Sequence, residues 1–297
     1  MNPPPRVLVI RGGAIGDFIL TLPALRLLRD TIPGCHLEVI GYPAIAELAR
    51  TAGLADSIRS LEHRTMAPLF AKTAPIDEAL AEHLRSFNLV VSFLYDPDGH
   101  FRASLERIGV KTLIECSPLV KPDGPHASKQ LAQGLEKLAM FLEDNHLHRA
   151  HFERHPNNHH RIAIHVGSGS EKKNWPLHHW QQVADSFPNS EIIFITGEAE
   201  AARGIQPPGH TTWHALPLTE LATRLTTCTT FLGHDSGISH LAGACGVPSL
   251  LLFGPTDPAI WAPPQPWVQF LRNPTHSMSA LSVDEVKLAA AQVVAKS

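Results

Sequence analysis

Short β-rich apolar runs alternate with helix-length segments along almost the whole chain of 297 residues. Several of the runs are continuously apolar, which is typical of strands covered on both faces in a parallel sheet. The expected strands are 6–11, 36–41, 57–61, 88–94, 110–115, 161–167, 191–197, 229–235 and 248–254. Helical patterns between them include 74–87, 128–145, 176–187 and 218–228. This alternation predicts a doubly wound α/β fold.

A polar stretch, RAHFERHPNNHHR at 149–161, breaks this pattern and is interpreted as a domain linker. Each half of the chain then opens with a strand that runs into a glycine-containing loop. We therefore expect two Rossmann-like domains, 1–152 and 153–297, that face each other across a cleft at the carboxyl ends of both sheets. The amphipathic last helix, 283–296, is a candidate to pack back on the N-terminal domain.

The composition excludes several classes of protein. A formal net charge of −3 gives no electrostatic reason to expect nucleic acid as a partner. Neither a signal-peptide pattern nor a run of about 18 apolar residues is present, so we expect a cytoplasmic protein without a membrane span. The cysteines form no CxxC pair, which suits buried thiols in a reducing compartment and argues against a structural zinc site. They are Cys35, Cys116, Cys228 and Cys245.

The histidines of the linker, His151, His155, His159 and His160, suggest a metal site as an alternative. A spacing of four residues on a helix can bind zinc. Pro156 disfavours a regular helix at this point, so we interpret the stretch as a solvated linker.

The opening stretch RVLVIRGGAIGDFILTLPALRLL, 6–28, places Gly12, Gly13 and Gly16 between a strand and a helix, with Asp17 at the mouth of that helix. The dinucleotide fingerprint G-x-G-x-x-G is not met, and the second strand ends in VIGYP without the carboxylate that would bind ribose. Aspartate is favoured as a helix cap. An aspartate that caps a helix can also accept a proton when it faces a cleft.

The stretch HVGSGSEKKNWPLHHW, 165–180, follows another buried strand. Its small residues, including Ser168, can present backbone N–H groups and hydroxyls to phosphate oxygens, and Lys172 and Lys173 follow. The Walker pattern is absent, so this loop is not a P-loop. The alternative is a flexible surface loop with two solvated lysines.

A third stretch, GHDSGISHLAGACGVPSLLLFGPTDP at 233–258, reads as strand, turn, short helix and strand. Ser236 and Gly237 lie where the helix begins, and free N–H groups there attract a diphosphate. Asp235 would repel phosphate, so it suits sugar hydroxyls or a helix cap. His240 shares a helical face with Ser236 and is either a functional residue or an ordinary core histidine.

Together these stretches resemble glycosyltransferase family nine, the ADP-heptose lipopolysaccharide heptosyltransferases. The matching pieces are GGAIGDFILTLPAL, KNWP and DSGISHLAGACGVPSLLLFGPTDP, in the family's order and spacing. The resemblance implies a GT-B fold with a donor-binding C-terminal domain and an acceptor-binding N-terminal domain. It also implies an inverting transfer without a metal or other cofactor.

Carried over by position, the resemblance implies that Asp17 is the general base and that Lys173 neutralises the donor diphosphate. Glu200 lies near the position of the family's ribose-binding glutamate, and Glu198 is the alternative. Leu216 lies at the position whose side chain and backbone line the adenine ring in the family. The donor-binding set implied in this way is Ser168, Glu200, Leu216, Asp235, Ser236, Gly237 and His240.

On the acceptor side we expect Gly13 and Gly16 of the first loop, with Arg59, Arg64 and Lys72 as the candidates to meet an acidic acceptor. The partners that the resemblance implies are a nucleotide-diphosphate sugar, more specifically ADP-heptose, and a glycan or glycolipid acceptor of the cell envelope. Peripheral contact with the inner membrane fits such an acceptor. The alternatives are a non-catalytic nucleotide-sugar binder and an NAD-dependent oxidoreductase.

Overall fold

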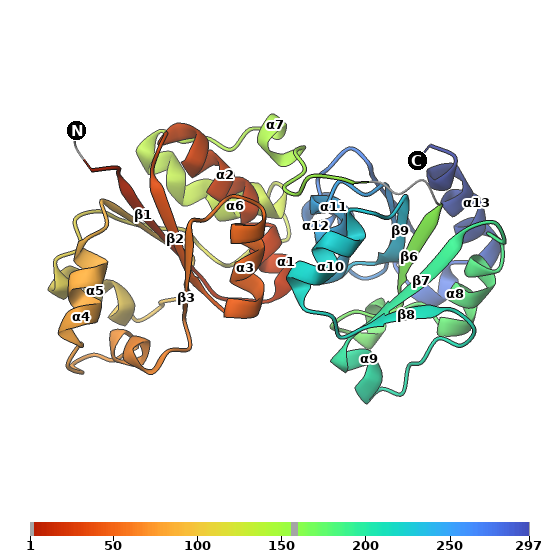
Figure 1. Cartoon of the computed structure of the whole chain (residues 1–297), viewed down its shortest axis with the longest axis horizontal. Coiled ribbons are helices and arrows are strands. Elements are labelled where there is room, and N and C mark those ends of the chain that lie inside the picture. The colour runs from red at the N-terminus through yellow and green to blue at the C-terminus, as the bar shows by residue number, and fades with distance from the viewer. Residues whose placement is uncertain (1–2, 156–159, 297) are drawn as a thin grey trace. The chain divides into compact units, whose positions relative to one another are not determined.

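The computed structural model describes residues 3–155 and 160–296. Contacts divide the chain into two compact units, Met1–His146 and Leu147–Ser297 (Figure 1). This division falls a few residues before the predicted boundary at 152/153. The reason is local, because the amides of His151 and Phe152 both donate to the carbonyl of Ala244. His151 and Phe152 are buried, so this part of the predicted linker is packed rather than solvated.

The N-terminal unit is built on a five-stranded parallel sheet with the order β3-β2-β1-β4-β5. Its strands are β1 Arg6–Arg11, β2 His36–Gly41, β3 Ser57–Ser60, β4 Leu89–Ser92 and β5 Leu113–Glu115. Its helices are α1 Ile15–Ile19, α2 Leu22–Thr31, α3 Pro43–Thr51, η1 Arg64–Phe70, α4 Glu78–Arg85, α5 His100–Ile108, α6 Ala127–Ala132, η2 Gln133–Leu138 and α7 Asp144–Leu147, the last of which ends across the division.

The C-terminal unit is built on a six-stranded parallel sheet with the order β11-β10-β9-β6-β7-β8. Its strands are β6 Arg161–His165, β7 Glu191–Thr196, β8 Thr211–His214, β9 Thr230–His234, β10 Ser249–Phe253 and β11 Val268–Arg272. Its helices are η3 Glu171–Lys173, α8 Leu177–Ala184, α9 Glu198–Ala202, α10 Leu218–Leu225, α11 Gly237–Ala244, α12 Pro258–Trp261, η4 Met278–Ala280 and α13 Val283–Val294.

Each sheet reverses its strand order at its first strand. β1 lies between β2 and β4, and β6 lies between β7 and β9. In open α/β sheets, ligands bind outside the carboxyl ends of the strands at such a switch point. The loop that carries Asp17 follows β1, and the loop at 166–170 follows β6. The fold therefore places both predicted loops where a ligand site is expected.

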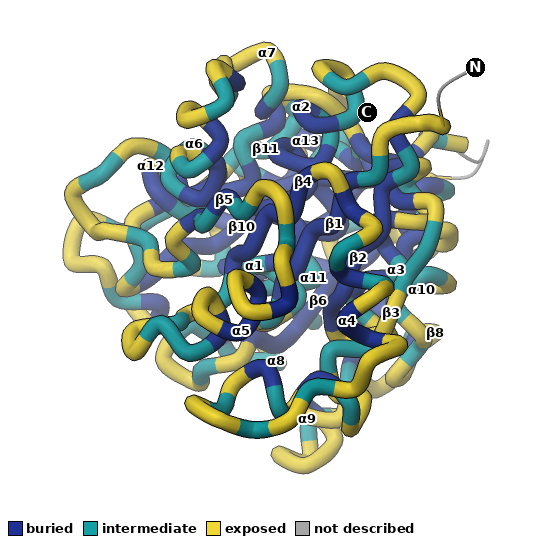
Figure 2. Tube along the Cα trace, turned by 90° about the vertical axis from the view of Figure 1, so that its left-hand side faces the viewer, coloured by how far each residue is buried: buried dark blue, intermediate teal, exposed yellow. Residues whose placement is uncertain are grey.

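The apolar strands form the core of each unit, as the sequence pattern predicts. Leu8, Ile10 and Val90 are fully buried in the N-terminal unit, among the side chains of α4 and α5. In the C-terminal unit, Ile162, Ile164 and Leu252 are fully buried in a cluster that includes the inner face of α13. Figure 2 shows the buried strands in dark blue with exposed segments around them.

The predicted helix at 128–145 is wrong as a single element. It divides into α6, η2 and α7. A Cβ built at Gly134 would lie 2.5 Å from the carbonyl oxygen of Glu115 and 2.6 Å from Sγ of Cys116. The chain therefore approaches β5 closely at a glycine, which is a poor residue for a helix interior. In the described ranges, no helix has the length and apolar character that crossing a membrane requires.

Candidate functional site

Asp17 lies in the first turn of α1, directly after the glycine loop. Its Oδ2 accepts a hydrogen bond from the amide of Ala14 at 3.2 Å, so the side chain helps to close the start of the helix. Gly13 has φ of +95°, and a Cβ built there would lie 3.2 Å from the same carboxylate oxygen. The loop thus needs glycine both for its backbone conformation and for the approach of Asp17. The carboxylate remains half-buried.

Two polar side chains hold the backbone carbonyl of Asp17. Thr21 donates to the carbonyl of Asp17 at 2.8 Å, and Nη2 of Arg11 donates to the same carbonyl at 3.2 Å. Nη1 of Arg11 donates to the carbonyl of Phe93 at 3.3 Å. Burial lowers the pKa of the Arg11 guanidinium, and the charge of Asp17 acts in the opposite direction. The buried cation therefore joins β1, the end of β4 and the first turn of α1 at the switch point.

The other predicted acceptor-side residues are spread out. Gly16 lies in α1 beside Asp17, and Arg64 is exposed at the start of η1. Arg59 lies on β3, where its Nε donates to Glu38 at 3.2 Å. Glu38 is buried, and His83 and Arg59 hold the pKa of its carboxyl below the usual value against the effect of burial. Arg59 thus has a structural partner within the sheet.

The C-terminal unit brings Lys173 and Asp235 together. Nζ of Lys173 lies 2.6 Å from Oδ2 of Asp235, and the hydroxyl of Thr256 donates to the same oxygen at 2.6 Å. The Asp235 side chain is 8% exposed and that of Lys173 is 28% exposed. Predicted as a sugar ligand or a helix cap, Asp235 is not the cap of α11, because Ser236 takes that position.

Ser236 connects the start of α11 to the end of β6. Its Oγ accepts from the amide of Ser239 at 3.3 Å and lies 3.2 Å from Nδ1 of His165. Ser239 in turn donates to the carbonyl of His234. Gly237 is the first residue of α11, and His240 is buried further along the helix. These bonds fix the N-terminus of an eight-residue helix at the carboxyl edge of the sheet.

His234 ties the lysine loop to the strand that carries Asp235. Its Nε2 accepts from the amide of Trp175 at 2.8 Å and from the indole N–H of Trp180 at 3.1 Å. Burial and the neighbouring His165 lower the pKa of His234 to about 3. Burial lowers the pKa of His165 to about 4, against the opposing charge of Glu200. Both imidazoles are therefore neutral at physiological pH.

Ser168 stabilises the loop after β6. Its hydroxyl donates to the carbonyl of Ser170 at 2.8 Å and lies 2.6 Å from Oδ1 of Asn174. Arg203 donates to the carbonyl of Ser168 at 3.1 Å. The predicted alternative of a flexible surface loop does not fit this set of bonds. The residues KNW instead belong to a hydrogen-bonded loop that presents Lys173.

Glu200 is buried beside the same loop, whereas Glu198 is exposed. Oε2 of Glu200 accepts from the amide of Gly197 at 2.7 Å. A Cβ built at Gly167 would overlap the other carboxylate oxygen of Glu200, so only glycine leaves room for this approach. Of the two rival glutamates, Glu200 is the one that lies against the loop after β6.

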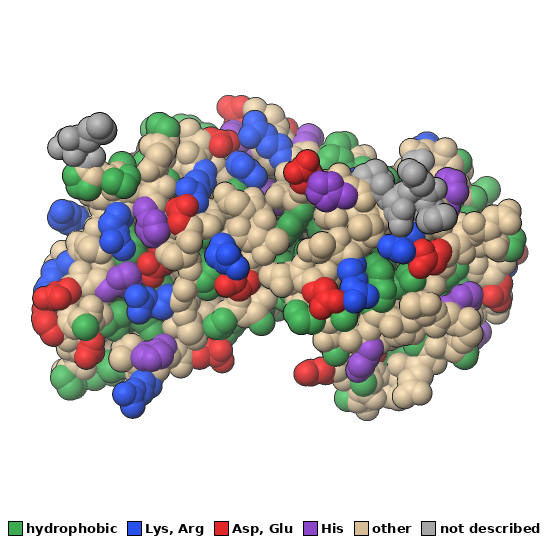
Figure 3. Space-filling view, viewed as in Figure 1, with side chains coloured by type: hydrophobic (Ala, Val, Ile, Leu, Met, Phe, Trp, Pro, Cys, Tyr) green, Lys and Arg blue, Asp and Glu red, His purple; other side chains and the backbone are tan. Residues whose placement is uncertain are grey.

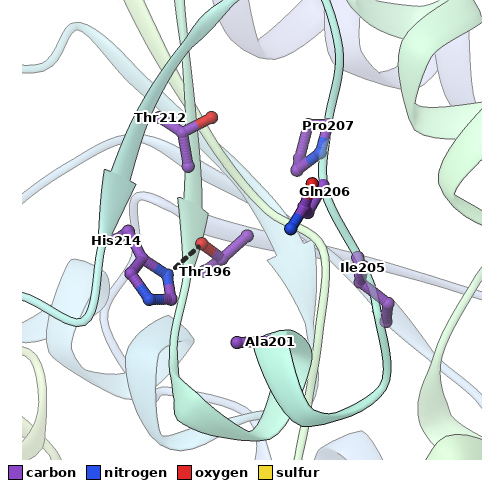
Figure 4. A pocket seen from close by; sticks show the side chains of 7 residues that line it. All are labelled: Thr196, Ala201, Ile205, Gln206, Pro207, Thr212 and His214. Atoms are coloured by element: carbon purple, nitrogen blue, oxygen red, sulfur yellow. Dashed lines mark hydrogen bonds between the residues drawn. The ribbon is translucent and has the colours of Figure 1, made fainter.

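A pocket of about 270 Å³ lies beside β7, β8 and α9 (Figure 4). The last residues of the two strands, Thr196 and His214, line it and are joined by a hydrogen bond of 3.0 Å. The next residue, Ala215, has φ of 45°, and its amide donates to the carbonyl of Thr196. This turn leads directly to Leu216, which is half-buried. The predicted adenine-lining position thus adjoins the rim of the pocket.

Across residues 3–155 and 160–296, no group of three or more His, Cys, Asp or Glu side chains has the geometry to hold a metal ion. His159, one of the linker histidines considered for a zinc site, lies outside the described residues. Within the described ranges all four cysteines are free and buried, in agreement with the sequence prediction.

Comparison with known proteins identifies the family. The sequence model of glycosyltransferase family 9 (heptosyltransferase) matches residues 127–288, more than half of the chain. The chain belongs to glycosyltransferase family 9. The matched residues include every donor-side position discussed above. This membership makes the protein a glycosyltransferase and argues against the oxidoreductase alternative.

Individual relatives agree with the family 9 assignment. Lipopolysaccharide heptosyltransferase 1 of Escherichia coli O18:K1:H7 is 23% identical over 319 aligned residues, which cover 95% of this chain and 96% of that protein. A family 9 structure from Veillonella parvula has a TM-score of 0.78 at 18% identity and covers 99% of this chain and 98% of its own. The structure of E. coli ADP-heptose lipopolysaccharide heptosyltransferase II has a TM-score of 0.74 at 14% identity, covering 98% and 99%. The fold of the family 9 chain is thus GT-B, with two Rossmann-like units.

Three residues of the family 9 chain that the sequence did not single out contribute to these clusters: Arg11, His165 and His234. All three are polar residues at the carboxyl ends of strands with apolar centres. That position was a usable signal, because a polar side chain at the end of a buried strand lies at the ligand edge of the sheet. Thr256 was inside the matched GPTDP piece but was not named.

Proposed function

We propose that this protein is an inverting glycosyltransferase that needs no metal and transfers a heptose from ADP-heptose to a cell-envelope glycan acceptor of the lipopolysaccharide-core type. The proposal rests most strongly on the cluster of Lys173, Asp235 and Thr256 beside the capped start of α11. A leaving nucleoside diphosphate develops negative charge, which a lysine and oriented N–H groups stabilise. In this proposal the enzyme works in the cytoplasm, at the inner face of the membrane.

In this scheme Lys173 exchanges its partner when the donor binds. Without donor its ammonium neutralises Asp235. With donor the ammonium turns to the diphosphate, and Asp235 is left to accept hydrogen bonds from sugar hydroxyls and from Thr256. The amide of Gly237, the first residue of α11, completes the contact with phosphate oxygens. Glu200 binds the ribose, while the backbone around Leu216 lines the base.

Asp17 acts as the general base on the acceptor hydroxyl. In an inverting displacement, the base removes the proton on the side opposite to the leaving group. In this proposal the base belongs to the N-terminal unit and the diphosphate site to the C-terminal unit. The two relatives whose names specify a lipopolysaccharide heptosyltransferase support the choice of donor sugar and acceptor class.

The first experiment is a thermal-shift panel with ADP, UDP, GDP, NAD and ADP-heptose. A ligand at 100 times its dissociation constant stabilises a protein by about 2.7 kcal/mol. We expect stabilisation by ADP and more by ADP-heptose. Stabilisation by UDP or GDP instead of ADP would reject ADP-heptose as the donor.

The second experiment compares Asp17→Asn with the matched variant Asp98→Asn, which changes an exposed carboxylate on another loop of the same unit. Asp17→Asn is expected to lower turnover by about 10²–10⁴ while the ADP dissociation constant stays within about twofold. Asp98→Asn is expected to leave both unchanged. Full turnover by Asp17→Asn would remove Asp17 from its role, and donor binding without transfer by the wild type would support the non-catalytic binder.

A further inference from the structure

The carboxyl edge of the N-terminal sheet presents several exposed, large apolar side chains. Tyr42, Phe70, Tyr95 and Leu119 lie in the segments that follow β2, β3, β4 and β5. Their exposed fractions are 39%, 43%, 65% and 61%. The sequence contains two tyrosines, and both are in this group. Asp17, the proposed general base, follows β1 at the same edge. An exposed apolar side chain therefore follows each of the four remaining strands of this sheet.

Tyr42 lies close to the loop of Asp17. A Cβ built at Gly12 would lie 3.9 Å from Cε2 of the Tyr42 ring and 3.8 Å from Cδ2 of Leu94. A Cβ built at the next residue, Gly13, would lie 3.2 Å from the Asp17 carboxylate. The tyrosine ring and the carboxylate are thus neighbours of consecutive glycines. The two glycines therefore allow the tyrosine ring and the carboxylate to approach adjacent positions of one loop.

Tyr95 is presented by a fixed loop. The carboxylate of Asp96 accepts from the amides of Phe101 and Arg102 at 3.2 and 2.9 Å. On the other side, the amide of Phe93 donates to the carbonyl of Ile10 at 2.8 Å, which ties the loop to β1. Hydrogen bonds hold the backbone on both sides of Tyr95, while its ring is exposed. Exposed aromatic side chains on the ligand edge of an ordered sheet are candidates for ligand contact.

The charges at this edge do not suit a strongly anionic ligand. The segments between the strands and the next α-helices contain three cations, Arg64, Lys72 and Lys121. They also contain five carboxylates, Glu62, Asp77, Asp96, Asp98 and Asp123. Figure 3 likewise shows positive and negative side chains interspersed over the face that it draws. An excess of cations would favour recognition through phosphate groups, and these segments have none.

We propose that Tyr42 and Tyr95 bind the acceptor by stacking on the apolar C–H face of a sugar ring, and that phosphate groups on the acceptor contribute little to binding. Tyrosine offers a large, rigid contact area with a polar tip, which suits a sugar that is apolar on its faces and polar at its rim. This inference rests on the proposed function, and it assigns the acceptor's contacts on the side of Asp17.

The test measures transfer from ADP-heptose to de-acylated lipopolysaccharide of a bacterial mutant that adds no core heptose. The acceptor is used in two forms, with its phosphates and after their chemical removal. Acceptor KM and kcat are determined for wild type, Tyr95→Ala, Tyr95→Phe and Tyr42→Ala. Phe270→Ala is the matched control, because Phe270 is 51% exposed but lies on β11 of the other unit.

We expect Tyr95→Ala and Tyr42→Ala to raise the acceptor KM about tenfold, the size of one lost aromatic contact, with ADP affinity unchanged. Tyr95→Phe keeps the ring and should stay near wild type, as should Phe270→Ala. Removing the acceptor's phosphates should change KM by less than about threefold. ADP affinity is followed by tryptophan fluorescence, since all five tryptophans lie in the C-terminal unit.

Unchanged acceptor KM in both alanine variants, or a large rise on dephosphorylation of the acceptor, would overturn this inference while the proposed function stands. No transfer by the wild type to either form would reject the proposed acceptor class, and the inference would fall with it.

Discussion

Each of the two units has a parallel sheet with a switch point at its first strand, but the loops at the two switch points differ in burial and in their contacts. In the C-terminal unit, Asp235 is 8% exposed, and its carboxylate is bound by Lys173 and Thr256. In the N-terminal unit, the Asp17 carboxylate is half-buried and accepts from a backbone amide. The first site is a buried polar network, and the second is an open edge lined by exposed apolar side chains.

Under the proposed function, the contrast follows from what each ligand would require. A diphosphate carries charge in a fixed shape, so donors that are already oriented bind it without reorganising. His165 and His234 serve that end as buried neutral groups that hold Ser236 and Trp175. An acceptor hydroxyl needs one base and room for a bulky glycan. A carboxylate held by the backbone at an open edge meets that need with few contacts.

In the C-terminal site, the largest effect is expected from Lys173→Met. The variant removes the cation for the leaving diphosphate and leaves Asp235 buried beside an apolar side chain. Loss of one preorganised charge-stabilising group lowers turnover by about 10²–10³. The control is Lys172→Met, because Lys172 is the exposed neighbour in the same loop. Equal turnover in the two variants would mean that the pair of Lys173 and Asp235 has a structural role only. The difference in burial between the two sites would then not reflect a difference in their ligands.

A smaller effect is expected from His234→Leu, which leaves two buried N–H donors, those of Trp175 and Trp180, without their acceptor. Each unpaired buried donor costs about 1–3 kcal/mol, so the free energy of unfolding should fall by about 2–6 kcal/mol. His234→Gln keeps an acceptor near the same position and should recover part of the loss. Urea unfolding followed by tryptophan fluorescence measures both.

The matched change in the N-terminal unit is His63→Leu. His63 is exposed, and its Nδ1 accepts from the amide of Thr65 at 3.4 Å. Its loss should cost no more than about 1 kcal/mol. If His63→Leu lowered the free energy of unfolding as much as His234→Leu does, the buried network would not contribute more to stability than the open edge, and the proposed difference would be wrong.

A further effect is a dependence of stability on pH. Burial lowers the pKa of His234 to about 3 and that of His165 to about 4, whereas an unfolded histidine titrates near 6.5. Below about pH 6.5 the unfolded chain takes up protons that the folded chain refuses, so the free energy of unfolding decreases as the pH falls. Above that pH the stabilisation is complete.

Each buried histidine contributes at most about 1.4 kcal/mol per pH unit to this slope. Unfolding by urea at pH 7.5 and 5.5 should therefore give a shallower slope for His234→Gln than for wild type, since the variant retains one of the two groups. Identical slopes would show that His234 takes up a proton in the folded chain as readily as in the unfolded chain between pH 7.5 and 5.5.

Much of the fold is predictable from the sequence because buried parallel strands are continuously apolar. All nine predicted strands are present, two of them with the predicted ends and seven with shifted ends. β8 and β11 escaped prediction since they are the edge strands of their sheet, where the residues TTWH and VQFLR are less buried and less apolar. The break at Gly134 depends on a close approach to β5, which no local pattern encodes.

The site is predictable to a lesser degree. Glycine loops and the matched pieces identify Asp17, Lys173 and Asp235, since their signals are local. The sequence does not reveal that Lys173 pairs with Asp235, which is 62 positions away, or that His165 supports Ser236, which is 71 positions away. Such partners depend on which strands lie side by side. The predicted role of Arg59 remains a prediction, although the guanidinium already has Glu38 as a partner.

The distribution of aromatic residues gives the protein a built-in molecular ruler. Both tyrosines belong to the N-terminal unit and all five tryptophans to the C-terminal unit. Light absorbed by tyrosine can pass to tryptophan without contact, and the efficiency of this transfer depends steeply on distance. The emission ratio of the unlabelled protein therefore reports the separation of its two halves during a catalytic cycle, and removal of Tyr42 and Tyr95 would provide the blank.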